Sequence, residues 1–285
     1  MKNKFLLYTA VVMLSFSQVM AQAPGNHLRD SLEKSALAEL VSYISADTLD
    51  IKLEETEKNS INHTGEQHQL VAATARGAGI ETPSAGSWDK FLPTVYNKEA
   101  TVGSPFLLFL YVPGLVVNDS YTIVHKPDYR YNYDKMSGNL VLIRNGDSPI
   151  AVNKSQVRMF CLKTDKGGFI FMRVPLINDG EFFQVIYEGS KYSVYKLYKN
   201  KFIKSDQTTN GYTANGKNYD EYEDIVTYYL LDENKEVSHI FELRKKSVKT
   251  VFGSVNPAAE KYLTDHKNED ITENLVAGLT AELNK

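Results

Sequence analysis

The sequence predicts a mainly β protein of the α+β class, in which an antiparallel β meander is preceded by one helix and followed by amphipathic helices. Runs rich in Val, Ile, Tyr and Phe alternate with short polar turns through the middle of the 285-residue chain. These turns are too short to hold crossover helices, so neighbouring strands should be antiparallel. Towards both ends of the chain the apolar residues recur with the period of a helix instead. A sandwich-like and a barrel-like arrangement of the strands both stay open.

Residues 1–21 have the layout of a secretory signal peptide. Two lysines precede the apolar run Phe5–Phe16, and Val19 and Ala21 supply small residues at positions −3 and −1 of a cleavage site. An uncleaved membrane anchor is the alternative, but the apolar run is shorter than the ~20 residues that span a bilayer. We therefore expect cleavage after Ala21, export to the periplasm or the cell surface, and no transmembrane segment in the mature chain.

Residues 22–54 are predicted to be an N-terminal helical segment, with a helix over about 28–46. Apolar residues recur there every four positions, at Leu28, Leu32, Ala36, Leu40 and Ile44. Asp30 and Glu33 have the spacing of a capping box, in which side chains satisfy unpaired backbone N–H groups of the first turn. Such a helix packs on the core of the domain. A detachable helix that binds a partner is the alternative.

Residues 55–87 are predicted to be a flexible linker. The stretch contains no aromatic residue, and it is mainly polar or alanine apart from four glycines. A segment with so little large apolar surface cannot offset the entropy that a chain loses when it is ordered. His63 and His68 lie here, but two histidines without a third ligand do not define a metal site. The sequence predicts no metal site and no cofactor.

Residues 88–243 are predicted to form the antiparallel β domain. Asn145–Gly146 is the strongest hairpin signal, because a type I′ turn needs positive φ at both central residues, and it should join two directly paired strands. The only cysteine, Cys161, alternates with Val157 and Met159 along one predicted strand. We expect a buried, unreactive thiol at this position, and a catalytic nucleophile is the alternative.

Residues 244–285 are predicted to be a C-terminal helical tail. Asn256–Pro257 is a good helix start, because asparagine caps a first turn and the missing N–H of proline costs nothing there. Asp270 and Glu273 repeat the capping-box spacing. Apolar residues then recur every four positions, at Ile271, Leu275, Leu279 and Leu283. The pattern predicts a short helix and then a terminal amphipathic helix that packs on the sheet.

Composition and motifs argue against several classes of function. The formal net charge of −3 argues against a nucleic-acid-binding protein, which needs cationic groups for phosphate contacts. A single cysteine permits no intrachain disulfide and no multi-cysteine metal site. The sequence also lacks a Gly-x-Ser-x-Gly elbow, a phosphate-binding P-loop, a His-Glu-x-x-His pair and a dinucleotide-binding glycine fingerprint. These absences favour a protein that binds rather than catalyses.

Several short motifs follow one another after residue 100. They are Gly103–Phe106, Pro113–Gly114, Phe182–Gly189, Tyr228–Leu230 and Arg244–Lys246, and the helical tail comes last. In this order, over about residues 100–285, they resemble a group of uncharacterised exported β-rich proteins of Bacteroidota. The resemblance implies a periplasmic or surface-facing location. It implies no activity, cofactor or catalytic residue.

Tyr129, Tyr131 and Tyr133 alternate along one predicted strand, so their rings share one side of it. On an exposed sheet face such a row could stack on sugar rings or on aromatic groups of a partner. These three tyrosines are therefore the candidate ligand-binding residues. Packing across strands inside the core is the alternative.

These observations predict an exported binding or scaffolding module of the cell envelope, with a glycan or an envelope protein as its partner. Two alternatives stay open: a hydrolase whose site is assembled from residues distant in sequence, and a subunit of an envelope assembly that docks through its terminal helices. A pocket with converging titratable groups would favour the hydrolase, and an exposed aromatic face would favour binding. An exposed apolar helix face would favour assembly.

Overall fold

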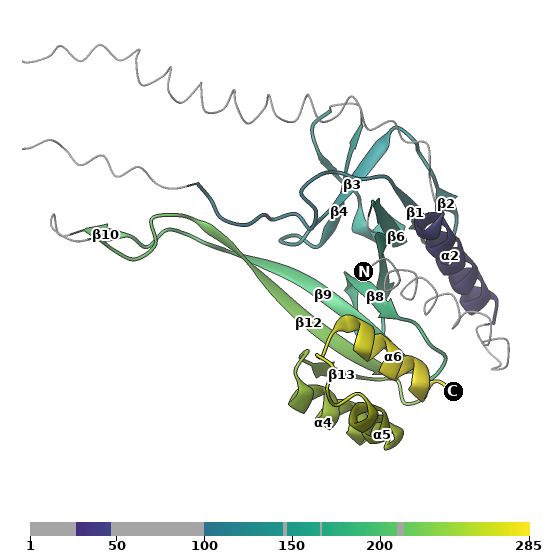
Figure 1. The fold of residues 1–285 in the computed structure, drawn as a ribbon. Coiled ribbons are helices and arrows are strands. Elements are labelled where there is room, and N and C mark those ends of the chain that lie inside the picture. The colour runs from purple at the N-terminus through teal and green to yellow at the C-terminus, as the bar shows by residue number, and fades with distance from the viewer. Residues whose placement is uncertain (1–26, 47–99, 145–146, 166, 210–213) are drawn as a thin grey trace, which may run out of the picture. The chain divides into compact units, whose positions relative to one another are not determined.

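The computed structural model describes residues 27–46, 100–144, 147–165, 167–209 and 214–285, and Figure 1 draws the other residues as a grey trace. The predicted signal peptide (1–21) and the predicted linker (55–87) lie outside the described residues. The described part is mainly β, with antiparallel sheets, one helix before them and three helices after them. The predicted fold class is confirmed.

Eight strands form one antiparallel sheet in the order β13-β12-β9-β8-β7-β6-β1-β2 (Figure 1). They are β1 (Gly114–Asn118), β2 (Ile123–Val124), β6 (Val157–Thr164), β7 (Gly167–Val174), β8 (Asn178–Tyr187), β9 (Tyr192–Ile203), β12 (Glu221–Asp232) and β13 (Val237–Phe241). Strands β6 to β9 pair in sequence order, as the short turns between them predict. Strands β13 and β2 are the two edges, so this sheet is open.

The remaining strands form two smaller antiparallel sheets. One consists of β3 (Tyr129–Asp134), β4 (Asn139–Arg144) and β5 (Ile150–Ala151), and the other of β10 (Thr208–Thr209) and β11 (Ala214–Asn215). Gly138 in the β3–β4 turn has φ 66°, which glycine adopts without steric cost. The strands on either side of the predicted Asn145–Gly146 turn are directly paired, because Val141 lies opposite Ala151. The two turn residues themselves lie outside the described residues.

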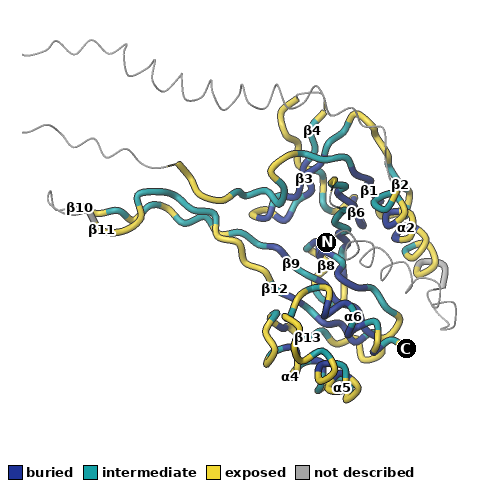
Figure 2. The backbone as a smooth tube through the Cα atoms, viewed as in Figure 1, coloured by how far each residue is buried: buried dark blue, intermediate teal, exposed yellow. Residues whose placement is uncertain are grey.

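Different layers cover the two faces of the eight-stranded sheet. Helix α2 (His27–Ser45) packs on β6 and β7 on one face, and its outer side is exposed (Figure 2). The three-stranded sheet packs on the other face. Alternation along β6 explains the division: Met159 and Cys161 belong to the cluster under α2, whereas Phe160 and Leu162 belong to the cluster under the small sheet.

Helix α2 confirms the predicted N-terminal helix, but its buried side is shorter along the helix than the predicted stripe. The buried residues are Ala36, Leu37, Leu40 and Val41, whereas Leu32 is 42% exposed. The predicted capping box is wrong here, because Asp30 lies inside α2 and Glu33 contacts the sheet.

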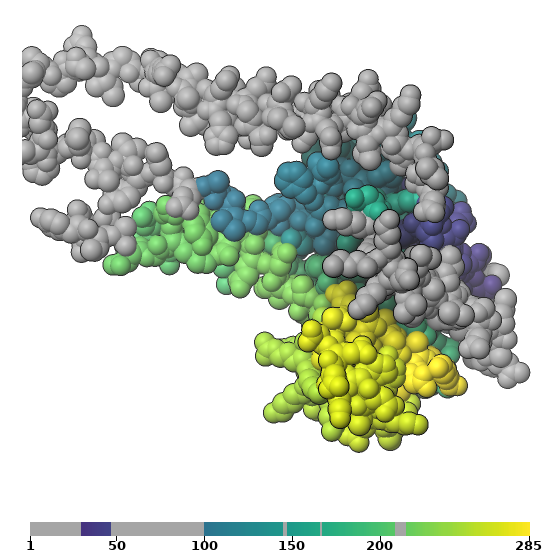
Figure 3. All heavy atoms as spheres, viewed as in Figure 1, coloured from purple at the N-terminus to yellow at the C-terminus, as the bar shows by residue number. Residues whose placement is uncertain are grey.

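Three C-terminal helices, yellow and yellow-green in Figure 3, pack with β8, β9, β12 and β13 around a third hydrophobic cluster. They are α4 (Lys245–Val255), α5 (Ala258–Asp265) and α6 (Glu273–Leu283). Helix α5 begins beside Asn256–Pro257, as predicted, and the Ala258 N–H donates to Asn256 Oδ1. Helix α6 is the predicted terminal helix, but its N-cap is Thr272, whose hydroxyl accepts from Leu275 N–H. The predicted capping box at Asp270 is therefore wrong.

Candidate functional site

The three candidate tyrosines lie on β3, and their row is not exposed. The exposed fraction is 2% for Tyr131 and 0% for Tyr133, whereas Tyr129 is partly exposed. The three-stranded sheet packs on the large sheet, so the shared side of the row faces the core. Tyr133 stacks on Phe171 with ring centroids 4.9 Å apart. The expectation of an exposed recognition row is wrong for Tyr131 and Tyr133.

Tyr129 and Tyr131 nevertheless line a pocket, which we call the tyrosine pocket. Its volume is about 450 Å³. The lining residues are Val116, Asn118, Asp119, Ser120, Val124, Tyr129, Tyr131, Leu142, Val152, Gln156 and Val157. They come from β1, β2 and the turn between them, from β3 and β4, and from the segment around η1 (Lys154–Gln156). The pocket thus lies where one edge of the large sheet meets the small sheet.

The lining of the tyrosine pocket is mostly apolar. Five aliphatic side chains and two tyrosine rings line it, and the other four lining residues are polar. Burial raises the pKa of Tyr131 to about 12. A pocket with this lining suits an apolar or aromatic group.

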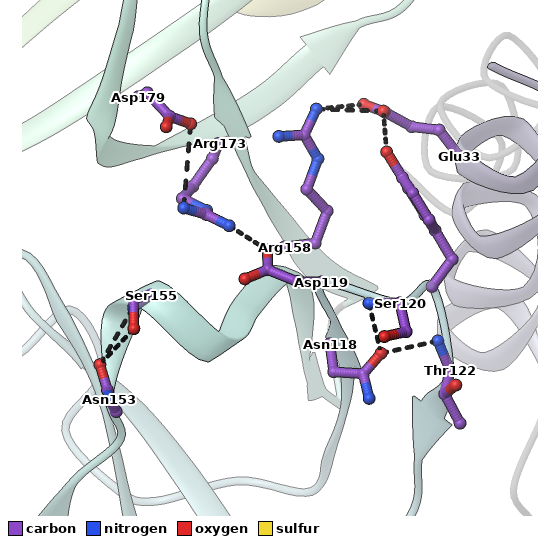
Figure 4. A network of polar contacts seen from close by, with 11 residues as sticks. Glu33, Asn118, Asp119, Ser120, Thr122, Asn153, Ser155, Arg158, Arg173 and Asp179 are labelled. Atoms are coloured by element: carbon purple, nitrogen blue, oxygen red, sulfur yellow. Dashed lines mark hydrogen bonds and ion pairs between the residues drawn. The ribbon is translucent and has the colours of Figure 1, made fainter. Parts of the chain in front are cut away.

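The β1–β2 turn fixes the polar rim of the pocket. The backbone N–H groups of Ser120 and Thr122 both donate to Asn118 Oδ1, at 2.9 Å each. Asp119 forms an ion pair with Arg173, which also lies 3.8 Å from Asp179 (Figure 4). Asn118 and Asp119 are therefore already paired within the chain, and they fix the shape of the opening.

A second ion pair ties α2 to the large sheet. Arg158 Nη2 donates to Glu33 Oε2 at 3.1 Å, and the Tyr121 hydroxyl donates to the same oxygen at 2.8 Å. Figure 4 shows the Arg158 guanidinium group facing the Glu33 carboxylate. The capping-box spacing had suggested a different partner for Glu33, namely the backbone of its own helix.

A β-bulge places Arg158 on the α2 side of the sheet. Val117 of β1 lies opposite Met159, but the next residue, Asn118, lies opposite Val157. Arg158 is therefore an extra residue in β6, and the alternation of sides is interrupted there. Bulges re-aim side chains in this way. Strict alternation would have placed Arg158 on the opposite face, together with Phe160.

Two carboxyl groups with raised pKa values lie near α2 and not in the tyrosine pocket. Burial raises the pKa of Glu188 to about 8, although its carboxylate accepts a hydrogen bond from the Tyr195 hydroxyl at 2.6 Å. Burial raises the pKa of Glu233 to about 7, and the charge of Glu33 acts in the same direction on both groups. Carboxyl groups of this kind are typical of acid–base sites. Neither of them is a lining residue of the pocket.

The described residues contain no group of three or more His, Cys, Asp or Glu side chains that could hold a metal ion. Cys161 is buried, as predicted, and burial raises the pKa of its thiol to about 12. A thiol with so high a pKa carries almost no thiolate at neutral pH, so Cys161 is a poor nucleophile.

Phe109 is an exposed aromatic side chain that the sequence did not single out. It is 95% exposed, on a segment that crosses the edge of β3. Buried Asn132 holds this segment, because its Nδ2 donates to Leu108 O at 2.8 Å and its Oδ1 accepts from Leu108 N–H at 3.1 Å. A buried polar side chain thus fixes the conformation from which Phe109 projects.

Comparison of the chain with family models, with curated proteins and with solved structures found no match. The resemblance to exported Bacteroidota proteins therefore stays a prediction. No helix among the described residues is long and apolar enough to cross a bilayer. The function proposed next depends on the geometry of the tyrosine pocket.

Proposed function

We propose that this protein is a binding or scaffolding module of the cell envelope, and that its tyrosine pocket takes an apolar or aromatic group of a partner protein. The observation that carries the proposal is the mostly apolar pocket of about 450 Å³ between the two sheets. Natural ligand pockets have volumes of roughly 300–1,000 Å³ and are lined mainly by apolar and aromatic side chains.

The arrangement of titratable groups favours binding over hydrolysis. A hydrolase needs a nucleophile or an activated water next to an acid or a base. Asp119 is the one carboxyl group among the described lining residues, and it is already paired with Arg173. Glu188 and Glu233, whose pKa values are raised, do not line the pocket.

The lining also favours a protein partner over a glycan. Sugar rings stack on exposed aromatic faces, but Tyr131 is only 2% exposed. The aliphatic side chains that surround it, such as Val116 and Leu142, suit a phenylalanine or leucine side chain instead. The envelope location is inferred from the predicted signal peptide at residues 1–21 and from the resemblance to exported proteins.

Val124→Arg tests the pocket, because Val124 lines it from the edge strand β2. The probe is the fluorescent dye anilinonaphthalene sulfonate, which binds apolar sites. We expect one saturable site on the wild-type chain, and an affinity weakened by about ten-fold or more in the variant, because an arginine head group would enter the pocket.

Val237→Arg is the matched control, because Val237 lies on the other edge strand, β13, and is 43% exposed. It should bind the dye like the wild-type chain. Wild-type affinity in Val124→Arg, or binding without saturation in all three proteins, would refute the proposed function.

A further inference from the structure

Helix α2 belongs to no strand pairing and packs on β6 and β7 through its side chains. Residues 47–99 connect it to the next described residue, Ala100. The departure of α2 from the sheet would therefore break no strand pair of the described residues.

The surface beneath α2 is apolar, and we call it the α2-binding face. Its central residues are Leu115, Val117, Met159, Cys161 and Met172. Ala36, Leu37 and Leu40 of α2 pack on it and are 4%, 3% and 0% exposed. Small and leucine side chains one turn apart are the usual anchors of a helix in an apolar groove.

Gly168 of β7 shapes one end of the α2-binding face for a helix. A Cβ atom at this position would lie 2.7 Å from two side-chain carbons of Ile44. Since real Cβ atoms do not approach so closely, any larger residue at position 168 would force the Ile44 side chain or the last turn of the helix to shift.

Arg158 makes the α2-binding face selective for an acidic helix. Its side chain is only 7% exposed, Glu33 is its ion-pair partner, and its Nε has no hydrogen-bond partner among the described residues. A buried cation without a carboxylate is strongly destabilising. A segment that replaces α2 must therefore bring a carboxylate to the same place.

Lys163, at the other end of the same strand, contacts the C-terminal end of the helix. Its Nζ donates to Tyr43 O at 2.8 Å and to Ala46 O at 2.6 Å. These carbonyls are at the negative end of the helix dipole, so Lys163 recognises a helix end whatever its sequence. Strand β6 thus supplies a cation for each half of a docked helix.

We propose that the α2-binding face is a docking site for an acidic amphipathic helix of a partner protein, and that α2 occupies it until such a helix displaces it. Charge complementarity with Arg158 defines the partner: its helix carries a carboxylate about one turn before a small-and-leucine stripe. Helix α2 is then an internal competitor, which lowers the apparent affinity for the partner by the fraction of time that the site is empty.

A labelled synthetic peptide of residues 27–46 tests this proposal on the full chain. In the Leu40→Asp chain, a carboxylate replaces a leucine that is 0% exposed, so the internal helix should vacate the site. We expect the peptide to bind this chain about ten-fold or more tightly than it binds the wild-type chain, because the internal competitor is lost. Glu33→Lys, which opposes Arg158 with a like charge, is a second chain variant with the same expected effect.

A double-substitution cycle tests the role of Arg158. On the Leu40→Asp chain, a peptide with Glu33→Gln should bind about ten-fold more weakly than the native peptide. On a chain that carries both Leu40→Asp and Arg158→Met, the two peptides should bind alike. Equal affinity of the two peptides on the Leu40→Asp chain would refute the charge-based definition of the partner.

Two other results would overturn the proposal. The first is the absence of saturable peptide binding to both the Leu40→Asp and the Glu33→Lys chains. The second is sedimentation of the wild-type chain as a dimer that the peptide dissociates, since the occupant would then be α2 of a second copy and not a different partner.

Discussion

Tyr131 and Phe109 are aromatic residues of neighbouring segments with opposite exposure. Tyr131 is 2% exposed and packs between the two sheets, whereas Phe109 is 95% exposed. Buried aromatic rings contribute to stability through the area they remove from water, and an exposed ring contributes almost none of this. Substitutions at these two positions should therefore differ strongly in their effect on the stability of the fold.

Tyr131→Ala should lower the free energy of unfolding by roughly 3–5 kcal/mol, the usual cost of truncating a large buried aromatic side chain. Phe109→Ala should change it by less than about 0.5 kcal/mol, as most exposed substitutions do. Urea unfolding followed by circular dichroism measures both values. A Tyr131→Ala protein as stable as the Phe109→Ala protein would show that Tyr131 lies outside the core.

Among the helices and strands, local sequence patterns predicted the features that depend on residues close together in the chain. The hydrophobic period predicted α2 and α6, and the short polar turns predicted the antiparallel pairing of the strands. The alternation of Tyr129, Tyr131 and Tyr133 predicted their shared side, but it could not predict that a second sheet covers it. That covering depends on contacts between residues far apart in the sequence.

The bulge at Arg158 marks the main limit of sequence reasoning for the site. A single extra residue reverses the side of the sheet to which a strand residue points, and no local pattern in the sequence of β6 predicts this bulge. Glu33 was assigned to a cap for the same reason, because its actual partners, Arg158 and Tyr121, lie more than 80 positions away in the chain. The signal that could have found the pair is the arginine among the apolar residues at the start of β6.

Three carboxyl groups from separate elements gather near the N-terminal half of α2. Glu188 follows β8, Glu233 lies in the β12–β13 turn, and Glu33 belongs to α2. Tyr195 of β9 donates to Glu188, and Lys34 is the nearby cation that opposes the rise of both pKa values. Ionisation of Glu188 and Glu233 would bring like charges together beneath the helix.

The pKa values of about 8 for Glu188 and about 7 for Glu233 predict a stability that falls as pH rises. The folded chain holds these protons to a higher pH than the unfolded chain, in which a glutamate has a pKa of about 4.3. Their contribution is fully present below about pH 4.3 and is lost as pH rises through about 7 to 8.

Urea unfolding of the wild-type chain and of a Glu188→Gln/Glu233→Gln chain at about pH 5 and about pH 8 measures this contribution. The wild-type chain should lose more stability over that interval than the double variant, whose side chains do not titrate. Glu269→Gln, at an exposed position on the C-terminal tail, should keep the wild-type pH dependence. Equal losses in the wild-type and double-variant chains would contradict the pKa values.

At the scale of the whole described chain, one open sheet supports two layers of different kinds. The three-stranded sheet and the C-terminal helices are joined to the large sheet by short connections, and they cover one face. Helix α2 covers the other face and is joined to it through residues 47–99. In the proposed docking role, α2 is the exchangeable layer and the β-sheet is the stable scaffold.

Hydrogen exchange of the native full chain is the sharpest test of an exchangeable α2, because it measures the opening of each element separately. The amides of α2 should exchange through a local opening, faster than the amides of β7 and β8 in the middle of the sheet. The Leu40→Asp chain should lose the protection of α2 and keep that of β7 and β8. Exchange of α2 in the wild-type chain only at the slow rate of β7 and β8 would contradict an exchangeable α2, because the helix would then leave the sheet only when the whole fold unfolds.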